Sequence, residues 1–240
     1  MKLRELVAMP FGLISRQCAE HVECFFLECR VAAIHGLGRI RARGFRNRRG
    51  LLLNLGSGAQ LKDGFLNIDF HPKSELRLDL RRPIPLPDDS CEVIFSEHFL
   101  EHLEYPEEAD AHLGDCRRLL AAGGVIKLSV PDTEWPLSEY GASDGEYLAA
   151  CKREDWHPAE CTTYLEHLNY HFRQRWTGTS RMDFQCHRFA YDFETLEKLL
   201  QRSGFVDVQR RDFEPGLDGE HRSPGSLLVI ATNPPASEEQ

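Results

Sequence analysis

A glycine turn and one carboxylate are the first residues whose types and spacing could do chemistry. The turn Gly56-Ser57-Gly58 follows the apolar run 51–55, and Asp69 follows the apolar run 65–68. A Gly-x-Gly turn lets the backbone approach a ligand closely, and a carboxylate after the next strand can accept hydrogen bonds from ribose hydroxyls. This combination predicts a nucleoside-binding site.

Three histidines are the second group of candidate residues. His98 and His102 belong to the segment His98-Phe-Leu-Glu101-His102, which follows the apolar run 92–95, and His187 comes 85 residues after His102. A neutral imidazole is a natural general base near pH 7, so these three histidines are the candidate catalytic residues. With Glu101 they also offer a ligand set suited to Zn²⁺ or Mn²⁺. The two interpretations stay open here, and no metal is assigned.

The elements that must position these residues are short and apolar. Short apolar runs bounded by turn residues are typical of strands buried on both faces of a parallel sheet, and ligands bind beyond the carboxyl ends of such strands. The runs cover 51–55, 65–68, 92–95 and 124–130. Later patterns predict helices over 13–37, 110–120 (closed by Gly123-Gly124) and 193–203, and strands over 205–208 and 226–232.

The chain divides into an extension, a body and a tail. Residues 1–50 form a helical extension with a basic connector, 51–233 form the body, and 234–240 form a disordered tail. Within the body, the aromatic-rich residues 133–185 follow the end of a strand, where a lid over the site is expected. We expect the N-terminal helix to pack on the sheet, and contact of 1–50 with an anionic membrane is the alternative.

Composition bounds the class of protein. Residues 1–50 carry ten Lys or Arg and four Glu, whereas the whole chain has a net charge of −9. The rest of the chain is therefore strongly acidic, and nucleic acid is not an expected partner. No run of 18 apolar residues occurs, no signal peptide is expected, and none of the eight cysteines forms a CxxC pair. We expect buried free thiols and a cytoplasmic location.

Several segments resemble class I S-adenosylmethionine-dependent methyltransferases. They are LNLGSGAQ, NIDF, LDLRRPIPLPDDSCEVIFSEHFLEHL and LLAAGGVIKLSVPD, followed by HRFAYDFETLEKLLQRSGFVDV at 187–208. The resemblance implies an α/β, Rossmann-like sheet, mostly parallel with an antiparallel last strand, and S-adenosylmethionine as cofactor. It implies a cofactor site whose residues are Asn54, Gly56, Ser57, Gly58, Asp69, Asp79 and Leu80 near the adenine, and Ser96 beside the methionine portion.

The chain departs from the family pattern in three ways. Asn54 stands where the family commonly has an acidic residue, and the third glycine is absent. Only ten residues separate Gly58 from Asp69, so the first helix must be reduced to a turn. A pyrophosphate needs a helix N-terminus beneath it, but S-adenosylmethionine carries no phosphate, so methyl transfer is favoured over NAD chemistry. This short form is similar to methyltransferases associated with cell-envelope saccharide genes.

The segment 98–102 has further interpretations. It matches the HxxEH pattern of inverzincin proteases, but it directly follows a predicted buried strand, which disfavours a protease. It also resembles the ExxEH segment of metal-assisted O-methyltransferases of small RNAs and of ubiquinone biosynthesis, with His98 in place of the first Glu. The predicted function is O-methylation of a small molecule or saccharide, with a metal-assisted O-methyltransferase and a non-catalytic S-adenosylmethionine-binding module as alternatives.

Overall fold

The computed structural model describes residues 15–142, 145–175 and 184–235. The predicted tail, 234–240, lies outside the described residues from position 236 onward, as do residues 1–14 of the predicted extension.

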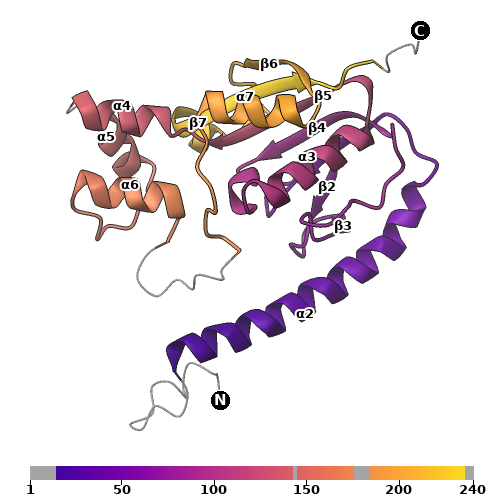
Figure 1. Cartoon of the computed structure of the whole chain (residues 1–240), viewed down its shortest axis with the longest axis horizontal. Helices are drawn as coiled ribbons and strands as arrows, with labels where there is room; N and C mark the ends of the chain where they lie inside the picture. The colour runs from indigo at the N-terminus through magenta and orange to yellow at the C-terminus, as the bar shows by residue number, and fades with distance from the viewer. Residues whose placement is uncertain (1–14, 143–144, 176–183, 236–240) are drawn as a thin grey trace.

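A seven-stranded sheet forms the centre of the molecule (Figure 1). Its spatial order is β3-β2-β1-β4-β5-β7-β6, and β7 runs antiparallel to both of its neighbours while the other pairs are parallel. The strands are β1 Leu51–Leu55, β2 Leu66–Asp69, β3 Leu76–Arg77, β4 Cys91–Glu97, β5 Leu120–Pro131, β6 Val206–Arg210 and β7 Ser226–Thr232. The predicted Rossmann-like sheet with an antiparallel last strand is confirmed, and β3 is an element that the sequence pattern did not indicate.

The strand β1 marks the point where the chain order of the sheet reverses. It pairs with β2 on one side and with β4 on the other, and Leu55 is in register with both Ile68 and Ser96. The carboxyl ends of the three strands therefore meet at one edge, and a ligand site is expected at such a switch point.

Two amphipathic helices cover one face of the sheet in Figure 1. The first, α3 (Glu107–Leu119), buries Leu113 and Cys116, and the second, α7 (Phe193–Arg202), begins at the side-chain cap of Asp192. The prediction that Gly123-Gly124 closes the first of these helices was wrong. β5 starts at Leu120, directly after α3, and both glycines lie inside it. A Cβ at Gly124 would lie 2.9 Å from the Ala121 carbonyl oxygen, which explains the glycine.

No helix occurs between β1 and β2, as the short spacing predicted. Asn54 holds the connecting turn instead. Its Nδ2 donates to the Gln60 carbonyl oxygen at 3.0 Å and to Asn67 Oδ1 at 2.8 Å. A hydrogen-bonded turn thus replaces the usual helix.

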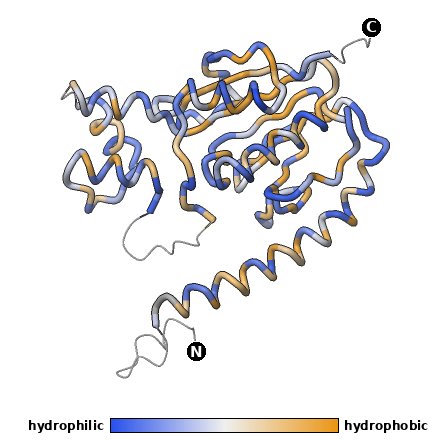
Figure 2. Tube along the Cα trace, viewed as in Figure 1, coloured by the Kyte–Doolittle hydropathy of each residue, from blue (hydrophilic) through white to orange (hydrophobic). Residues whose placement is uncertain are grey.

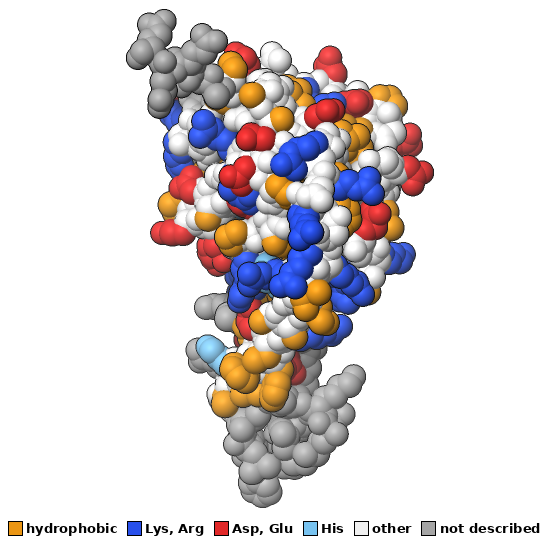
Figure 3. All heavy atoms as spheres, turned by 90° about the vertical axis from the view of Figure 1, so that its right-hand side faces the viewer, with side chains coloured by type: hydrophobic (Ala, Val, Ile, Leu, Met, Phe, Trp, Pro, Cys, Tyr) orange, Lys and Arg blue, Asp and Glu red, His pale blue; other side chains and the backbone are white. Residues whose placement is uncertain are grey.

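The N-terminal helix α2 (Arg16–Ala42) is longer than the predicted 13–37 and ends at a 3₁₀ turn, Arg43–Phe45. It packs along the edge strand β3, where a Cβ at Gly38 would lie 2.0 Å from the Arg77 carbonyl oxygen. Figure 3 shows exposed apolar and basic side chains on this side of the molecule, and Phe25 and Phe26 are each 63% exposed. The expected packing on the sheet therefore holds only along one edge.

Hydropathy separates the sheet from this helix (Figure 2). The hydrophobic colour gathers on the central strands, whereas α2 alternates between hydrophobic and hydrophilic positions along its length. Among the residues that the structure describes, no helix is long and apolar enough to cross a bilayer.

The described residues of the segment 133–185 form a small helical unit at one end of the sheet (Figure 1). It contains α4 (Glu134–Ala142), α5 (Glu146–Arg153) and α6 (Tyr164–Arg173). Tyr147 is buried and its ring contacts those of Trp135 and Tyr164, so some of the aromatic residues form the unit's own core. A role for this unit as a lid stays a prediction.

The cysteines are unpaired in the described residues, but they are not all buried. Five of the eight are buried, while Cys18 and Cys29 on α2 are exposed. The expectation of buried thiols was wrong for these two, because α2 covers only the edge of the sheet.

Candidate functional site

A cavity of about 510 Å³ lies at the carboxyl ends of β1, β2 and β4. Ligand pockets of about 300–1,000 Å³ are typical of small-molecule sites. The cavity wall includes nine of the residues that the sequence analysis selected, namely Asn54, Gly56, Ser57, Gly58, Asp69, Asp79, Leu80, His98 and His102. Ser96 and His187 do not line it.

The glycine turn forms the floor of this cavity. Gly56 has a φ of +71°, and a Cβ there would lie 2.5 Å from Phe99 Cβ. Gly58 has a φ of +49°, and the space beside it is open. Asp69 Oδ2 accepts a hydrogen bond from the Gly58 N–H at 2.9 Å, so the carboxylate and the turn are held together at the cavity. A side chain at position 58 would occupy the open space beside the turn, which glycine leaves free for a ligand.

The polar neighbours of the turn hold its shape. Asn54 is bonded to the turn backbone, as described above, and Ser57 Oγ lies 3.0 Å from Ser74 Oγ. Both side chains line the cavity, and their hydrogen bonds within the chain fix the loop that a ligand would contact.

Asp79 is bound to its own arginine. Arg81 donates to both of its carboxylate oxygens at 2.9 Å and also binds Glu28 of α2 at 2.8 Å. Burial raises the pKa of Asp79, but the Arg81 hydrogen bonds outweigh it and the pKa is lowered overall. His35 Nδ1 accepts from the Asp79 N–H at 3.3 Å. These contacts join α2 to the cavity wall, a link that the sequence analysis did not foresee.

Ser96 and Glu97, the first two residues of the signature Ser96-Glu97-His98, point to opposite faces of β4, and only Glu97 lines the cavity. Ser96 is 2% exposed, and its Oγ has no hydrogen-bond partner among the described residues. Glu97 lines the cavity and accepts a hydrogen bond from the Gly219 N–H at 2.8 Å. Successive side chains of a strand point to opposite faces, so the carboxylate next to the selected serine reaches the cavity.

His98 follows β4 in a left-handed conformation, with a φ of +52°. Such a φ is uncommon outside glycine and here turns the side chain toward the site. The Ser226 hydroxyl donates to the Arg222 carbonyl oxygen at 2.9 Å, so its oxygen accepts from His98 Nε2 at 2.8 Å. His98 Nδ1 is then the unprotonated nitrogen, and it lies 3.6 Å from Glu101 Oε1.

His102 and His187 converge although 85 residues separate them. Their ring centroids are 5.1 Å apart. His102 Nδ1 donates to the Cys186 carbonyl oxygen at 3.3 Å, and His187 Nδ1 donates to the His171 carbonyl oxygen at 2.9 Å. Because a carbonyl only accepts, each ring keeps its proton on Nδ1 and has an unprotonated Nε2.

These rings are neutral. Burial lowers the pKa of both His102 and His187 to about 4, and burial holds the pKa of His98 well below its usual range. Arg222, which lines the cavity, acts in the same direction on all three.

Glu101 lies among the histidines and is 1% exposed. Neither carboxylate oxygen has a hydrogen-bond partner among the described residues, and burial raises the pKa of this group to about 8. Glu101, His102 and His187 each offer a ligand atom within 4.8 Å of the others. His98 approaches Glu101 but is not part of this compact group, so three of the four predicted ligands come together.

Glu97, Phe99 and Arg222 are among the wall residues that were not selected from the sequence. Glu97 ends the signature that was quoted, and its position beside His98 was the available signal. Phe99, which packs on Gly56, and Arg222 carry no such signal, because they reach the cavity only through the fold.

The residues present fit S-adenosylmethionine. The open space beside Gly58 lets a ligand contact the backbone directly, and the neighbouring Asp69 is partly exposed to the cavity. No helix begins at the glycine turn, so the turn lacks the helix N-terminus that a pyrophosphate needs, as expected for a ligand without phosphate.

Comparison with known protein families gives one match. Residues 64–128 match the family model described as "Methyltransferase domain". No curated protein sequence matches the chain significantly.

Solved structures of similar fold exist. An S-adenosylmethionine-dependent methyltransferase from Methanosarcina mazei has a TM-score of 0.48 and 15% identity, over 81% of this chain and 97% of that one. One from Archaeoglobus fulgidus has a TM-score of 0.45 and 17% identity, over 87% and 98%. The CurJ carbon methyltransferase has a TM-score of 0.42 and 16% identity over 78% of this chain, which spans 50% of that protein. These likenesses are too distant to transfer a substrate.

Proposed function

We propose that the chain is a class I S-adenosylmethionine-dependent methyltransferase and that it methylates a hydroxyl group of a small molecule or saccharide. The observation that carries the proposal is the pair of neutral histidines, His98 and His102, on the wall of the cavity. A hydroxyl must lose its proton as it is methylated, and an unprotonated imidazole can accept that proton.

The cofactor residues have distinct tasks in this proposal. Bound S-adenosylmethionine supplies a methyl group on a positively charged sulfur. Asp69 is placed to accept hydrogen bonds from ribose hydroxyls, and Gly58 leaves room for the ligand. Asn54 and Ser57 hold the turn in shape, while Asp79 and Leu80 form the wall proposed for the adenine. Ser96, which faces away, is replaced in its proposed role by Glu97.

The histidines would orient the acceptor and take its proton. His102 is fixed by its Nδ1–H bond to Cys186, so its Nε2 is directed at the site. His98 is fixed by Ser226 in the same way, with Nδ1 unprotonated. His187 lies behind His102 and does not reach the cavity, so we assign it to positioning.

Metal assistance is the second candidate, and a specific observation favours it. Glu101 is a buried carboxylate without a hydrogen-bond partner among the described residues, and the unprotonated Nε2 atoms of His102 and His187 lie close to it. Two imidazoles whose other nitrogens are fixed by carbonyls, together with one carboxylate, form a ligand set for Zn²⁺ or Mn²⁺. Methyl transfer that survives removal of all metal by chelation would leave only the general-base alternative.

A binding test addresses the cofactor site. Calorimetry with S-adenosylhomocysteine should show binding to the native chain and a higher melting temperature by mass action. Asp69→Ala should weaken binding by roughly 1–3 kcal/mol, and Gly58→Val should obstruct it. His21→Ala, on an exposed part of α2, is the control and should bind normally. Absence of binding at millimolar ligand would refute the site.

A transfer test separates an enzyme from a silent binding module. Labelled S-adenosylmethionine is incubated with the protein and a small-molecule extract, and labelled product is measured. His102→Ala should bind S-adenosylhomocysteine normally but lose most product formation. A protein that binds the cofactor and labels nothing, in extracts that include saccharides, would be the binding module.

The proposal also covers the compartment, the kind of acceptor and contact with membranes. The unpaired cysteines of the described residues support a reducing, cytoplasmic compartment, and the acidic body supports a small-molecule acceptor over nucleic acid. Contact of α2 with anionic membranes is supported by exposed Phe25 and Phe26 and the basic residues 39–49. The native protein should float with anionic vesicles in a density gradient. A variant with both phenylalanines replaced by serine should no longer float with them.

A further inference from the structure

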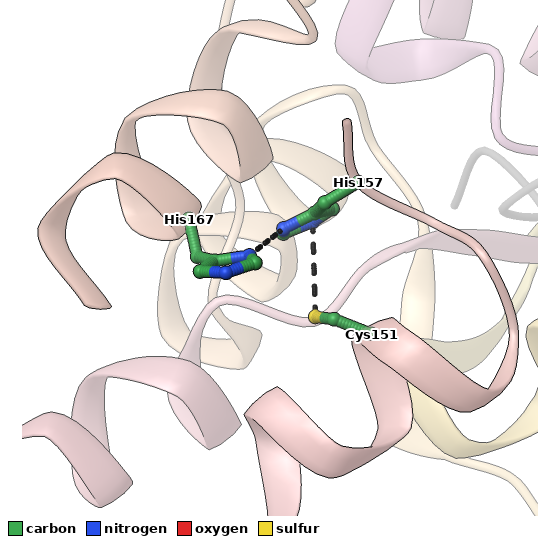
Figure 4. Close-up of side chains that lie close together, drawn as sticks. All are labelled: Cys151, His157 and His167. Atoms are coloured by element: carbon green, nitrogen blue, oxygen red, sulfur yellow. Dashed lines mark hydrogen bonds between the residues drawn. The ribbon is translucent and has the colours of Figure 1, made fainter. Parts of the chain in front are cut away.

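A second cluster of metal-ligating side chains lies outside the cavity, within the helical unit that contains α4, α5 and α6. Cys151 comes from the end of α5, His157 from the following loop and His167 from α6. Figure 4 shows the three side chains pointing toward one another, with His157 between the other two. Each offers a ligand atom within 4.8 Å of the others.

The contacts within the cluster are close. His157 Nδ1 lies 2.8 Å from His167 Nδ1, and His157 Nε2 lies 3.9 Å from Cys151 Sγ. Two ring nitrogens at such a distance can share one proton or one cation between them. His167 also hydrogen-bonds the backbone of Cys161, a contact that orients its ring.

Burial keeps the two imidazoles in a form that can bind a cation, whereas it raises the pKa of the Cys151 thiol to about 11, so this thiol must lose its proton when a metal binds. Cys151 is 2% exposed and His167 is 6% exposed. Burial lowers the pKa of His157 to about 3 and also lowers that of His167, so both imidazoles are neutral and each has an unprotonated nitrogen. Neutral imidazole nitrogen is the form that binds a metal.

We propose that Cys151, His157 and His167 form a structural Zn²⁺ site that ties α5, the loop after it and α6 together. One thiolate and two imidazoles are the soft and borderline ligands that Zn²⁺ takes in structural sites. On binding, a Zn–S bond replaces the S–H bond of Cys151, and one proton passes to the buffer for each ion bound. The fourth position would be taken by water.

The helices of this unit are short, so a bound metal would stabilise it. α4, α5 and α6 have 9, 8 and 10 residues, and isolated helices this short are marginal in water. Small units of this kind are commonly stabilised by a metal. Tyr147 connects the cluster to the candidate active site, because its hydroxyl lies 3.3 Å from His157 Nε2 and 3.0 Å from His171 Nδ1.

The alternative is a set of hydrogen-bonded neutral histidines with no metal. The experiment uses the full chain with His187→Ala as background, which disables the other candidate metal cluster. Metal content is measured after zinc loading and dialysis, and Co²⁺ substitution reports on the ligands. We expect one Zn²⁺ for each chain, and a Co²⁺ spectrum with a thiolate charge-transfer band.

Variants assign the metal to these residues. Cys151→Ser and, separately, His167→Gln should each lower the Zn²⁺ affinity by more than about a hundredfold, because a lost ligand costs at least as much as a lost neighbour of a ligand. Cys116→Ser is the matched control. Cys116 is also buried and lies 3.6 Å from His112 Nε2, but no third ligand is grouped with this pair in the described residues.

The outcomes are separable even where a variant folds poorly. Chelation of the zinc-loaded parent should lower its melting temperature, and this measurement needs no substitution of the cluster. Absence of bound zinc in the parent, a Co²⁺ spectrum without the thiolate band, or equal affinity in Cys151→Ser and Cys116→Ser would each overturn the proposal. Binding of S-adenosylhomocysteine is independent of these results, so failure of the zinc site and failure of the proposed function are distinguishable.

Discussion

Replacing Glu101 by glutamine should stabilise the metal-free protein at neutral pH. Glu101 is 1% exposed, its carboxylate oxygens have no hydrogen-bond partner in the described residues, and burial raises its pKa from 4.5 to about 8. A buried carboxylate without a partner disfavours the ionised form. Glutamine has nearly the same shape and cannot ionise.

The magnitude follows from proton linkage. A carboxyl whose pKa is raised in the folded state holds its proton more tightly there, so its contribution is fully present below pH 4.5. That contribution is lost as the pH rises toward 8. A pKa change from 4.5 to about 8 corresponds to about 5 kcal/mol, of which about 3 kcal/mol is lost by pH 7. Glu101→Gln avoids this loss.

The assay is urea unfolding of chelated protein at several pH values between 5 and 8. The difference in unfolding free energy between Glu101→Gln and the native chain should grow by about 1.4 kcal/mol for each pH unit. Glu107→Gln, at an exposed position nearby, is the control and should show no such slope. A difference that does not change with pH would refute the argument.

The same variant distinguishes the two mechanisms. If Glu101 binds a metal with His102 and His187, the native chain should gain stability when Zn²⁺ or Mn²⁺ is added. The glutamine variant should gain much less, and the order of stability should reverse. An unchanged order with saturating metal favours the metal-free base.

Three other predictions follow from the site and its surroundings. Methyl transfer should show no acidic limb near pH 6.5 and should fall only toward pH 4, because burial lowers the pKa of His102 to about 4. A rate profile that halves near pH 6.5 would contradict this. Asn54→Ala should cost roughly 1–3 kcal/mol in urea unfolding, since two hydrogen bonds of the buried Asn54 side chain are lost. Asn169→Ala, on an exposed part of α6, should cost less. Hydrogen exchange should be faster in 133–185 than in the sheet and should slow when ligands bind, and core-like protection without ligand would exclude a lid.

The positions of the main strands could be predicted because the local order of apolar and turn residues indicates which segments are buried. Each of the runs 51–55 and 226–232 is apolar and bounded by turn residues, and each became a strand with those limits. Parallel strands place their carboxyl ends at one edge, so Gly58 and Asp69 could be predicted to meet, and they lie 2.9 Å apart as donor and acceptor. The ten residues between them also excluded a helix by length alone.

Local patterns were insufficient where two faces or two distant segments had to be compared. Ser96 and Glu97 are neighbours, and only the packing of β4 in the sheet decides which side chain reaches the cavity. The same limit applied to α2, whose apolar positions indicated a helix but could not show that Phe25 stays 63% exposed among the described residues.

The electrostatic state of the histidines was decided by the tertiary structure. His102 donates its Nδ1–H to the Cys186 carbonyl and His187 donates its own to the His171 carbonyl. The unprotonated nitrogens then lie close to the Glu101 carboxyl, which burial keeps protonated. The sequence determined which residue types were available and which predicted strand they follow. Their protonation depends on exclusion of water, which only the assembled fold produces, because desolvation is a property of everything packed around a group.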